Sequence, residues 1–570
     1  MLDLLVRDAQ IVDGTGAARR RGDVGVRDGR IVALGDVDEP AAHTIDVDGA
    51  VVAPGFIDIH THYDAQVLWD PTLSPSILHG VTSVVGGNCG FSVAPLTTEG
   101  APYLMSMLAR VEGMPLSALE SALSWDWKTT ADFFRRIEGT VAPNVGFMVG
   151  HSAIRRSVMG EAAKERTATP DEISAMQSLL RDGLAAGGLG FSSSIARSHN
   201  DAEGDPVPSR CASYEEIIEL AAVCREFDGT CLEIVPHAGG EPFPEPVERL
   251  MVALTTSAGR PLDWNILHAL ASNRDEVNSK LAVSDRARTA GGKIVALLMP
   301  MPISLRLNFA SGFVLDMLPG WDKLMALPHN AKLDLLHSRD GRERMRRSAE
   351  QATSRFAQWG SYQLADCFSP ETRRYEGRTI SDIAAEQGKE PFDALADIVV
   401  ADNLRTSFGF AAVGDTRDDR QALQEALRDP RIVVGASDAG AHLDMIDTFR
   451  YTTVLLQSCV RDHELITLEE AVRLLTAVPA ELHGLRDRGV LRTGAWADLV
   501  VFDEAVVGSG DVHTRADLPA GEARLFAEST GVDYVIVNGE IIVDHGEVTD
   551  HRPGRLLRSG RDTVTPALDV

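Results

Sequence analysis

Eight short apolar segments, separated by helical stretches, constrain the fold of this 570-residue chain more than any other feature. Each segment has the length and the apolar content of a buried strand. The segments lie just before His60 and at 81–85, 145–149, 188–192, 230–235, 264–267, 294–298 and 432–434. Regular alternation of strand and helix is typical of parallel βαβ units, and eight such units favour a (β/α)8 TIM barrel of the α/β class.

The two ends of the chain follow a different pattern, with short strands joined by tight turns. Asp28-Gly29 and Asn538-Gly539 are dipeptides that favour two-residue β-hairpins. Hairpins are marginally stable alone, so we expect both ends to combine in one small β-sandwich, with two unrelated β tails as the alternative. The expected domains are a β-sandwich of 1–54 plus 488–548, a barrel of 55–300 plus 431–487, a helical insertion at 301–430 and a C-terminal tail at 549–570.

Composition limits the partners that the chain can have. The 83 acidic residues outnumber the 55 basic ones, and the net charge of −28 argues against nucleic acid and anionic membranes. No apolar run approaches the ~20 residues that span a bilayer, and the N-terminus lacks the order of a signal peptide. The six cysteines have no paired spacing, which indicates thiols in a reducing compartment. We expect a cytoplasmic protein that acts on a small molecule, with a homo-oligomer left open.

Metal-binding side chains follow several of the predicted strands at their C-terminal ends, where barrel enzymes place their active sites. His60 and His62 are two residues apart, so a strand would present both imidazoles on one face; two solvated loop histidines are the alternative. Imidazole, thiolate and carboxylate together suit Zn²⁺ best. The predicted ligands are His60, His62, Cys89, Glu233, His268 and Asp438, which could hold one zinc ion or two.

Each of the other ligands also has a structural alternative. Cys89 could be a small buried hydrophobe, and His268 could be a hydrogen-bonded core histidine. Asp438 could cap the helix that follows it. Glu233 interrupts an apolar strand, which is costly without a partner and so favours a function over a salt bridge to an arginine.

Longer motifs carry a resemblance to a known family. They are Phe56-Ile-Asp-Ile-His-Thr-His62, Gly87-Asn-Cys-Gly90, Gly150-His-Ser-Ala-Ile-Arg155, Ser437-Asp438, 494–503 and Arg552-Pro-Gly-Arg555. With these motifs the chain resembles, from end to end, the N-acyl-D-amino-acid deacylase (D-aminoacylase) branch of the amidohydrolase superfamily. The resemblance implies one or two zinc ions, a thiolate ligand after the second strand and a helical insertion before the eighth.

The chain departs from that family at one metal ligand and at the residues that bind the substrate carboxylate in the family. Glu233 replaces a histidine ligand on the fifth strand, and His237 could substitute only if the strand end bends. Residues 269–271, Met299-Pro-Met301 and Asp444 stand where the family has basic or tyrosine side chains, and the two methionines predict a more apolar pocket. The remaining candidates for binding the carboxylate are Arg155, Arg197 and Arg210.

Ligands and resemblance together predict a zinc-dependent hydrolase that cleaves an amide-type C–N bond. A metal ion activates water, and Asp438 is expected to act as general base and then as general acid. His151 or His442 would orient the substrate or stabilise the oxyanion. The alternatives are a metal-dependent hydrolase of a cyclic amide, lactone or peptide, and a catalytically silent barrel that serves as a scaffold.

Overall fold

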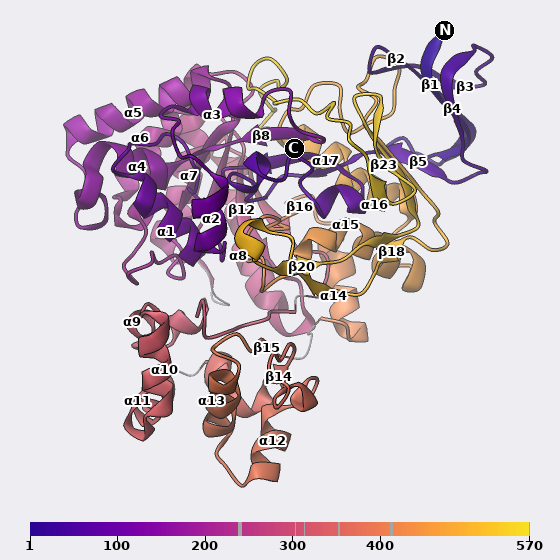
Figure 1. Ribbon diagram of the computed structural model, residues 1–570. Helices are drawn as coiled ribbons and strands as arrows, with labels where there is room; N and C mark the ends of the chain where they lie inside the picture. Colours follow the sequence, from indigo (N-terminus) through magenta and orange to yellow (C-terminus); the bar gives the residue numbers. More distant parts are fainter. Residues whose placement is uncertain (237–241, 303, 313, 352–353, 411–413, 569–570) are drawn as a thin grey trace.

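The computed structural model describes residues 1–236, 242–302, 304–312, 314–351, 354–410 and 414–568. Figure 1 shows a large body that contains the parallel strands, with the N-terminal strands at one side and a separate helical lobe below it. No helix among the described residues is both long enough and apolar enough to span a membrane.

Parallel strands form the centre of the large body. One sheet has the order β6 (Phe56–Asp58), β7 (Val81–Gly86), β8 (Asn144–Phe147). The other runs through β9 (Val149–Gly150), β10 (Gly190–Ser194), β11 (Cys231–Val235), β12 (Leu262–Leu267), β13 (Ile294–Leu298) and β16 (Ile432–Val434). The eight strand positions expected from the sequence are therefore strands here, with the third divided into β8 and β9.

These two sheets approach each other at both ends. Only Met148 separates β8 from β9 along the chain. At the other junction Thr61 pairs in parallel with Ala439, and the His62 amide donates to the Ala439 carbonyl at 2.7 Å. The strands are thus neighbours in chain order from β6 to β16, and the residues after β6 lie beside those after β16.

Helices alternate with the strands along the chain and flank them in the large body (Figure 1). They include α3 (Thr130–Ile137), α4 (His151–Met159), α5 (Pro170–Ala185), α6 (Tyr214–Val223), α7 (Glu245–Ala258), α8 (Arg274–Thr289), α14 (Arg417–Leu427) and α16 (Leu468–Leu475). In α5 the Thr169 side chain and Glu172 form a capping box, and Pro170 occupies the first turn, where its missing N–H costs nothing. Two further helices, α1 (Ala101–Val111) and α2 (Leu116–Ala122), belong to the long connection between β7 and β8.

Both chain ends contribute to one nine-stranded sheet. Its strands are β1 (Leu2–Ile11), β2 (Arg20–Arg27), β3 (Arg30–Gly35), β4 (Ala41–Asp46), β5 (Val51–Pro54), β17 (Leu499–Phe502), β22 (Val532–Val537), β23 (Glu540–Asp544) and β24 (Glu547–Val548). The antiparallel pair β5–β17 joins the two ends, which excludes two unrelated tails. Where a sandwich was expected, the pairing continues through a single sheet around one apolar core that includes Val6, Val24, Val501 and Ile536.

The segment between β13 and β16 forms most of the helical lobe. It contains α9 (Trp321–Met325), α10 (His329–His337), α11 (Arg339–Ala349), α12 (Ile380–Gln387) and α13 (Pro391–Ala401), with β14 (Gln363–Leu364) paired to β15 (Phe408–Gly409). The lobe has its own aromatic core, in which the rings of Trp321 and Trp359 stack at 5.2 Å.

The C-terminal segment after β24 packs on the large body. Leu556 and Leu557 are buried, and the Leu557 amide donates to the Val145 carbonyl at 2.7 Å. Segment 549–568, expected to be a turn-rich tail, therefore continues the wall of the large body beside β8.

Candidate metal centre

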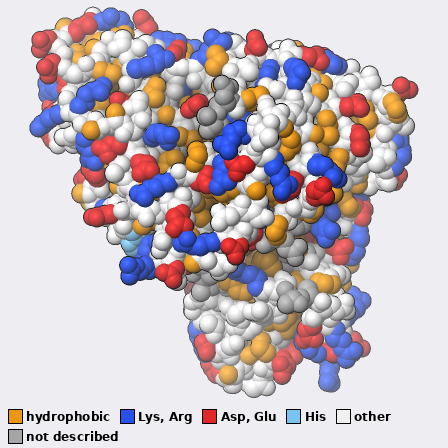
Figure 2. Space-filling view, turned by 180° about the vertical axis from the view of Figure 1, so that it is seen from behind, with side chains coloured by type: hydrophobic (Ala, Val, Ile, Leu, Met, Phe, Trp, Pro, Cys, Tyr) orange, Lys and Arg blue, Asp and Glu red, His pale blue; other side chains and the backbone are white. Residues whose placement is uncertain are grey.

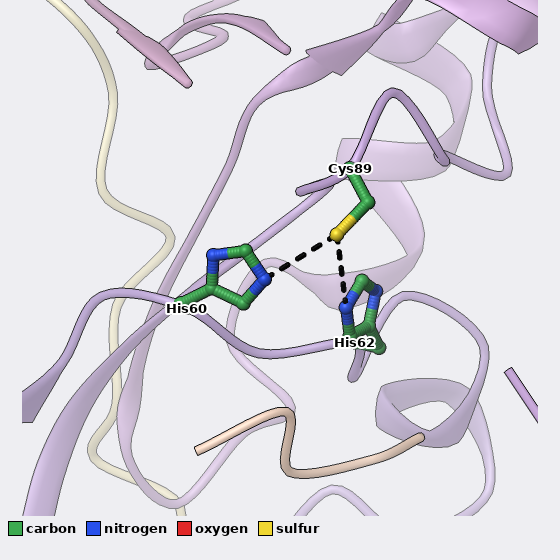
Figure 3. A group of neighbouring side chains, drawn as sticks. All are labelled: His60, His62 and Cys89. Atoms are coloured by element: carbon green, nitrogen blue, oxygen red, sulfur yellow. Dashed lines mark hydrogen bonds between the residues drawn. The ribbon is translucent and has the colours of Figure 1, made fainter. Parts of the chain in front are cut away.

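His60, His62 and Cys89 converge beyond the C-terminal ends of the first two parallel strands (Figure 3). Both histidines follow β6, and Cys89 lies in the loop after β7 with φ of 58°. The Cys89 Sγ lies 3.4 Å from His60 Nε2 and 3.7 Å from His62 Nε2. All three side chains are buried. The i, i+2 spacing in the sequence thus places both imidazoles against one thiol.

These distances fit a zinc site. With Zn–N bonds of about 2.05 Å and a Zn–S bond of about 2.3 Å at tetrahedral angles, S and N ligands lie about 3.6 Å apart. The two observed Sγ–Nε2 distances fall on either side of that value. Two imidazole nitrogens and one sulfur are also the donor types that zinc prefers. The residues present therefore fit the metal that the sequence motifs imply.

Asp438 lies beside the same two histidines. It follows β16, and its Oδ1 is 3.1 Å from His60 Nε2 and 3.6 Å from His62 Nε2. Burial disfavours the ionised carboxylate, but hydrogen bonds to the two histidines outweigh burial and lower the pKa of Asp438. This carboxylate is therefore ionised at neutral pH and able to accept a proton.

Glu112 is a carboxylate at this centre that sequence reasoning missed. It follows α1, is buried, and its Oε1 lies 3.5 Å from His62 Nδ1, on the ring edge opposite Cys89. Burial works to lower the pKa of His62, yet the charges of Glu112 and Asp438 raise it to about 9. The centre therefore attracts positive charge, as a cation site must. No sequence motif marks Glu112, because it is far from His62 along the chain.

Glu233 lies next to the metal centre and contacts the backbone of Cys89. Its Oε2 accepts a hydrogen bond of 2.7 Å from the Cys89 amide, so it holds the loop that presents the thiol. Its Oε1 has no hydrogen-bond partner among the described residues. Burial, and next the charge of Asp263, raise the pKa of Glu233. His237, considered as its substitute, lies outside the described residues.

Asn265, and not His268, reaches the three converging side chains from the sixth parallel strand. The Asn265 Nδ2 lies 3.3 Å from His60 Nε2 and 3.9 Å from Cys89 Sγ, and no described residue hydrogen-bonds to its buried Oδ1. His268 lies three residues further on, in the wall of the adjacent cavity. The alternation of Asp263 and Asn265 along β12 is the sequence signal that could have identified the inward-facing side chain.

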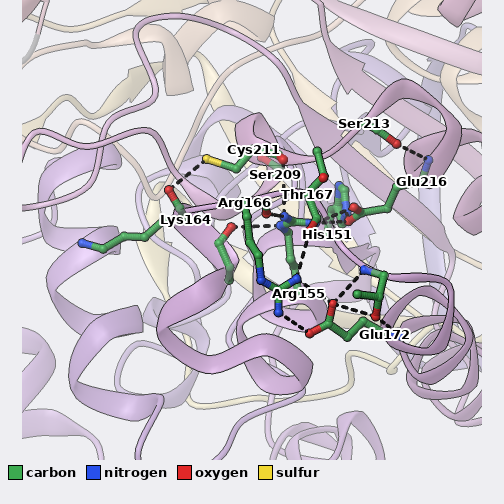
Figure 4. A network of polar contacts seen from close by, with 12 residues as sticks. His151, Arg155, Lys164, Arg166, Thr167, Glu172, Ser209, Cys211, Ser213 and Glu216 are labelled. Atoms are coloured by element: carbon green, nitrogen blue, oxygen red, sulfur yellow. Dashed lines mark hydrogen bonds and ion pairs between the residues drawn. The ribbon is translucent and has the colours of Figure 1, made fainter.

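His151 and Arg155 lie in a buried network of their own (Figure 4). His151 Nε2 is 3.0 Å from Glu216 Oε1, and Arg155 Nη1 donates to both Glu216 oxygens at 2.5 Å. Arg155 Nε donates to the Ala163 carbonyl, and its Nη2 donates to two further carbonyls. All five N–H donors of Arg155 are therefore used inside the protein, which leaves none for a substrate carboxylate.

Removal of Arg155 is expected to affect stability and not substrate binding. Breaking a buried ion pair by removing one partner costs roughly 3–5 kcal/mol, so Arg155→Met should lower the free energy of urea-induced unfolding by that amount and leave KM unchanged. Arg166→Met is the matched control, because the exposed pair Arg166–Glu172 contributes less than about 1 kcal/mol. A raised KM with unchanged stability would restore the substrate-binding role.

A cavity of about 550 Å³ adjoins the metal centre. Asp438, Asn265 and His442 form one part of its wall, and His199 and His268 also line it. The His442 amide donates to the Glu112 carbonyl, which connects the loop after β16 to the end of α1. The volume lies within the range of about 300–1,000 Å³ that is common for small-molecule sites. His442 is thus the predicted substrate-binding residue that the structure places at a cavity.

Comparison with known proteins identifies the family. The model of the "Amidohydrolase family" matches residues 43–543. N-acyl-D-glutamate deacylase from Alcaligenes xylosoxydans xylosoxydans is 30% identical over 563 residues, which cover 98% of this chain and 96% of the relative. The chain therefore belongs to the amidohydrolase family and is a metal-dependent hydrolase of C–N bonds, which confirms the predicted class and sets the scaffold alternative aside.

Two solved structures agree with this assignment. N-acyl-D-glutamate deacylase from Bordetella bronchiseptica, complexed with zinc and a phosphonate inhibitor, has 29% sequence identity and a TM-score of 0.67 and covers 98% of this chain and 99% of its own. A D-aminoacylase with a binuclear metal centre, activated by one metal and attenuated by a second, has 27% identity and a TM-score of 0.67 and covers 98% of this chain and 100% of its own. The resemblance inferred from the motifs is confirmed.

Proposed function

We propose that this protein is a zinc-dependent deacylase that hydrolyses the amide bond of an N-acylated amino acid. The observation that carries the proposal is the convergence of His60, His62 and Cys89 with the ionised Asp438 beside them. Deacylases of N-acyl-D-amino acids are among its relatives, and one of them binds zinc together with a mimic of the tetrahedral intermediate. The parallel strands that carry these residues would form a closed (β/α)8 barrel, with the residues 1–54 and 488–548 as a second domain.

In this proposal one zinc ion is held by His60, His62 and Cys89. When bound, zinc lowers the pKa of water and polarises a carbonyl group. Glu112 orients His62, and Glu233 orients the loop of Cys89, as outer partners of metal ligands commonly do. Asn265 and Asp438 are the further side chains that lie close enough to coordinate the same zinc ion. Glu233 and His268, which were predicted as ligands, are not part of this proposed ligand set.

Asp438 carries the proton in the proposed reaction. Its carboxylate accepts a proton from the attacking water and delivers it to the leaving nitrogen, so that the amine departs uncharged. His442 lies on the cavity wall next to Asp438, where it can orient the acyl group. Hydrolysis of a small amide needs neither a nucleic acid nor a membrane as a partner. The cytoplasmic location and the homo-oligomer expected from the sequence stay predictions.

The test is turnover before and after removal of the metal. Chelation should abolish hydrolysis of N-acyl amino acids, and one equivalent of Zn²⁺ per chain should restore it, as measured by release of the free amine. The panel includes D- and L-forms, cyclic imides, lactones and dipeptides, because the engaged Arg155 leaves open a substrate without a carboxylate. If only the cyclic imides or lactones were hydrolysed, the protein would be a metal-dependent hydrolase of cyclic substrates and not a deacylase. Turnover that chelation does not affect would contradict both of these functions.

A further inference from the structure

The cavity beside the metal centre extends to the helical lobe, and its far wall is apolar. Met299 and Met301 lead from β13 towards the lobe, and Leu305 and Met317 continue the wall. Phe356 and Phe410 complete it, with ring centroids 5.8 Å apart. Metal-centre residues and lobe residues therefore line one continuous cavity, which would bind an apolar group larger than an acetyl group.

One charged side chain on this wall has no oppositely charged partner within the described part of the chain. Of the four described charged residues that line the cavity, Glu276 and Lys280 pair at 2.6 Å, and Asp438 lies against the histidines. The fourth, Arg355, makes no ion pair with any described residue. Its guanidinium lies 4.1 Å from the centroid of the Phe410 ring, so that ring holds the cation at the lobe side of the cavity.

The other arginines considered from the sequence are not available at this cavity. Arg155 is fully engaged with Glu216 and backbone carbonyls. Arg210 Nη1 donates to the His199 carbonyl at 2.9 Å, and neither Arg210 nor Arg197 lines the cavity. An anionic group in the cavity would therefore find its partner in Arg355, on the lobe side and across the apolar wall from the metal centre.

We propose that the substrate has an apolar arm between the scissile amide and an anionic group, and that Arg355 binds that anion. This inference rests on the proposed amide hydrolysis, and it adds the class of substrate. Guanidinium pairs with a carboxylate through two parallel hydrogen bonds, which gives geometric as well as electrostatic selection. The helical insertion thereby becomes the part of the chain that recognises the substrate.

The experiment uses the zinc-loaded protein and amides of one amino acid. Their acyl chains have two, six or ten carbons, and each longer chain ends either in a methyl group or in a carboxylate. We expect KM to fall roughly two- to fourfold for each added CH2 group until the cavity is filled. A terminal carboxylate on the ten-carbon chain should lower KM by a further factor of about ten, with kcat unchanged.

Arg355→Gln should remove this tenfold advantage, so that the ten-carbon amides with a carboxylate end and with a methyl end have the same KM. Arg405→Gln is the matched control, because Arg405 lies in the same lobe, is exposed and stacks over Phe368 at 4.8 Å without lining the cavity. An advantage that survives in Arg355→Gln, or that is missing from the unaltered protein, overturns the proposal. The proposal is also overturned if Arg355→Gln raises KM equally for all of the amides, because Arg355 would then bind the amino-acid carboxylate next to the amide.

A protein that hydrolyses none of these amides would contradict the proposed function and still leave this inference testable. Calorimetry would then compare the ten-carbon amides that end in a carboxylate or in a methyl group. Tighter binding of the carboxylate form by the unaltered protein, lost in Arg355→Gln, supports the anion site without any turnover. Equal binding of the two amides overturns it.

Discussion

Replacing Asp438 by asparagine is expected to lower kcat by two to four orders of magnitude, the usual contribution of a general acid–base group. Asparagine has the same size but cannot accept the proton that Asp438 Oδ1 is placed to take beside His60 and His62. Zinc should remain bound, because His60, His62 and Cys89 are intact. The measurement is single-turnover hydrolysis of an N-acyl amino acid, together with the zinc content of the same sample.

Asp429→Asn is the control for this variant. Asp429 lies just before β16, at the opposite end of the strand that leads to Asp438, and it pairs with Arg431 at 2.6 Å. Parallel strands of this kind carry chemistry at their C-terminal ends, so kcat should stay unchanged in the control. If Asp438→Asn kept the kcat of the unaltered protein, another group would have to transfer the proton.

Cys89→Ser should abolish both zinc binding and activity. Loss of an outer partner alone weakens a metal site by roughly 10- to 100-fold, so loss of the sulfur ligand should weaken zinc binding by more than about 100-fold. Burial, and next the charge of Glu233, raise the pKa of Cys89, so the metal-free protein holds a thiol. A metal ion must displace that proton, and Cys89→Ser should release one proton fewer when zinc is added.

Zinc affinity is measured by competition with a chromogenic chelator, and proton release in a weakly buffered solution. Cys367→Ser provides the comparison, because Cys367 is equally buried but lies in the core of the helical lobe. It should bind zinc as the unaltered protein does. Zinc bound with unaltered affinity by Cys89→Ser would show that the sulfur is not a ligand, and the centre would then depend on His60, His62 and Asp438.

Local sequence was sufficient for the strands and for the first half of the metal centre. Short apolar runs placed the parallel strands within a residue or two, because a strand that is buried on both faces is mostly apolar. His60 and His62 were found for a similar reason: a strand has a period of two, so their spacing alone puts them on one face.

The sixth strand shows where such reasoning stops. His268 has the more typical metal-binding side chain, but Asn265 is the residue whose side chain reaches His60. The polar alternation of Asp263 and Asn265 indicates one face of β12, but the irregular pairing of β12 with β13 after Trp264, which changes the register before His268, is not visible in the residue types. Similarly, Arg155 on α4 donates to Glu216 on α6, and nothing near Arg155 in the sequence indicates that partner.

By itself, the sequence determined the class of fold and the family of this protein, together with His60, His62 and Cys89 as a cluster suited to zinc. Only the tertiary structure decided that Glu112 and Glu233 support those ligands, that Arg155 is used internally and that Arg355 faces the cavity. The physical reason is distance along the chain. Periodicity and motifs report on neighbours within one element, whereas charges and cavity walls are set by segments that meet only when the chain has folded.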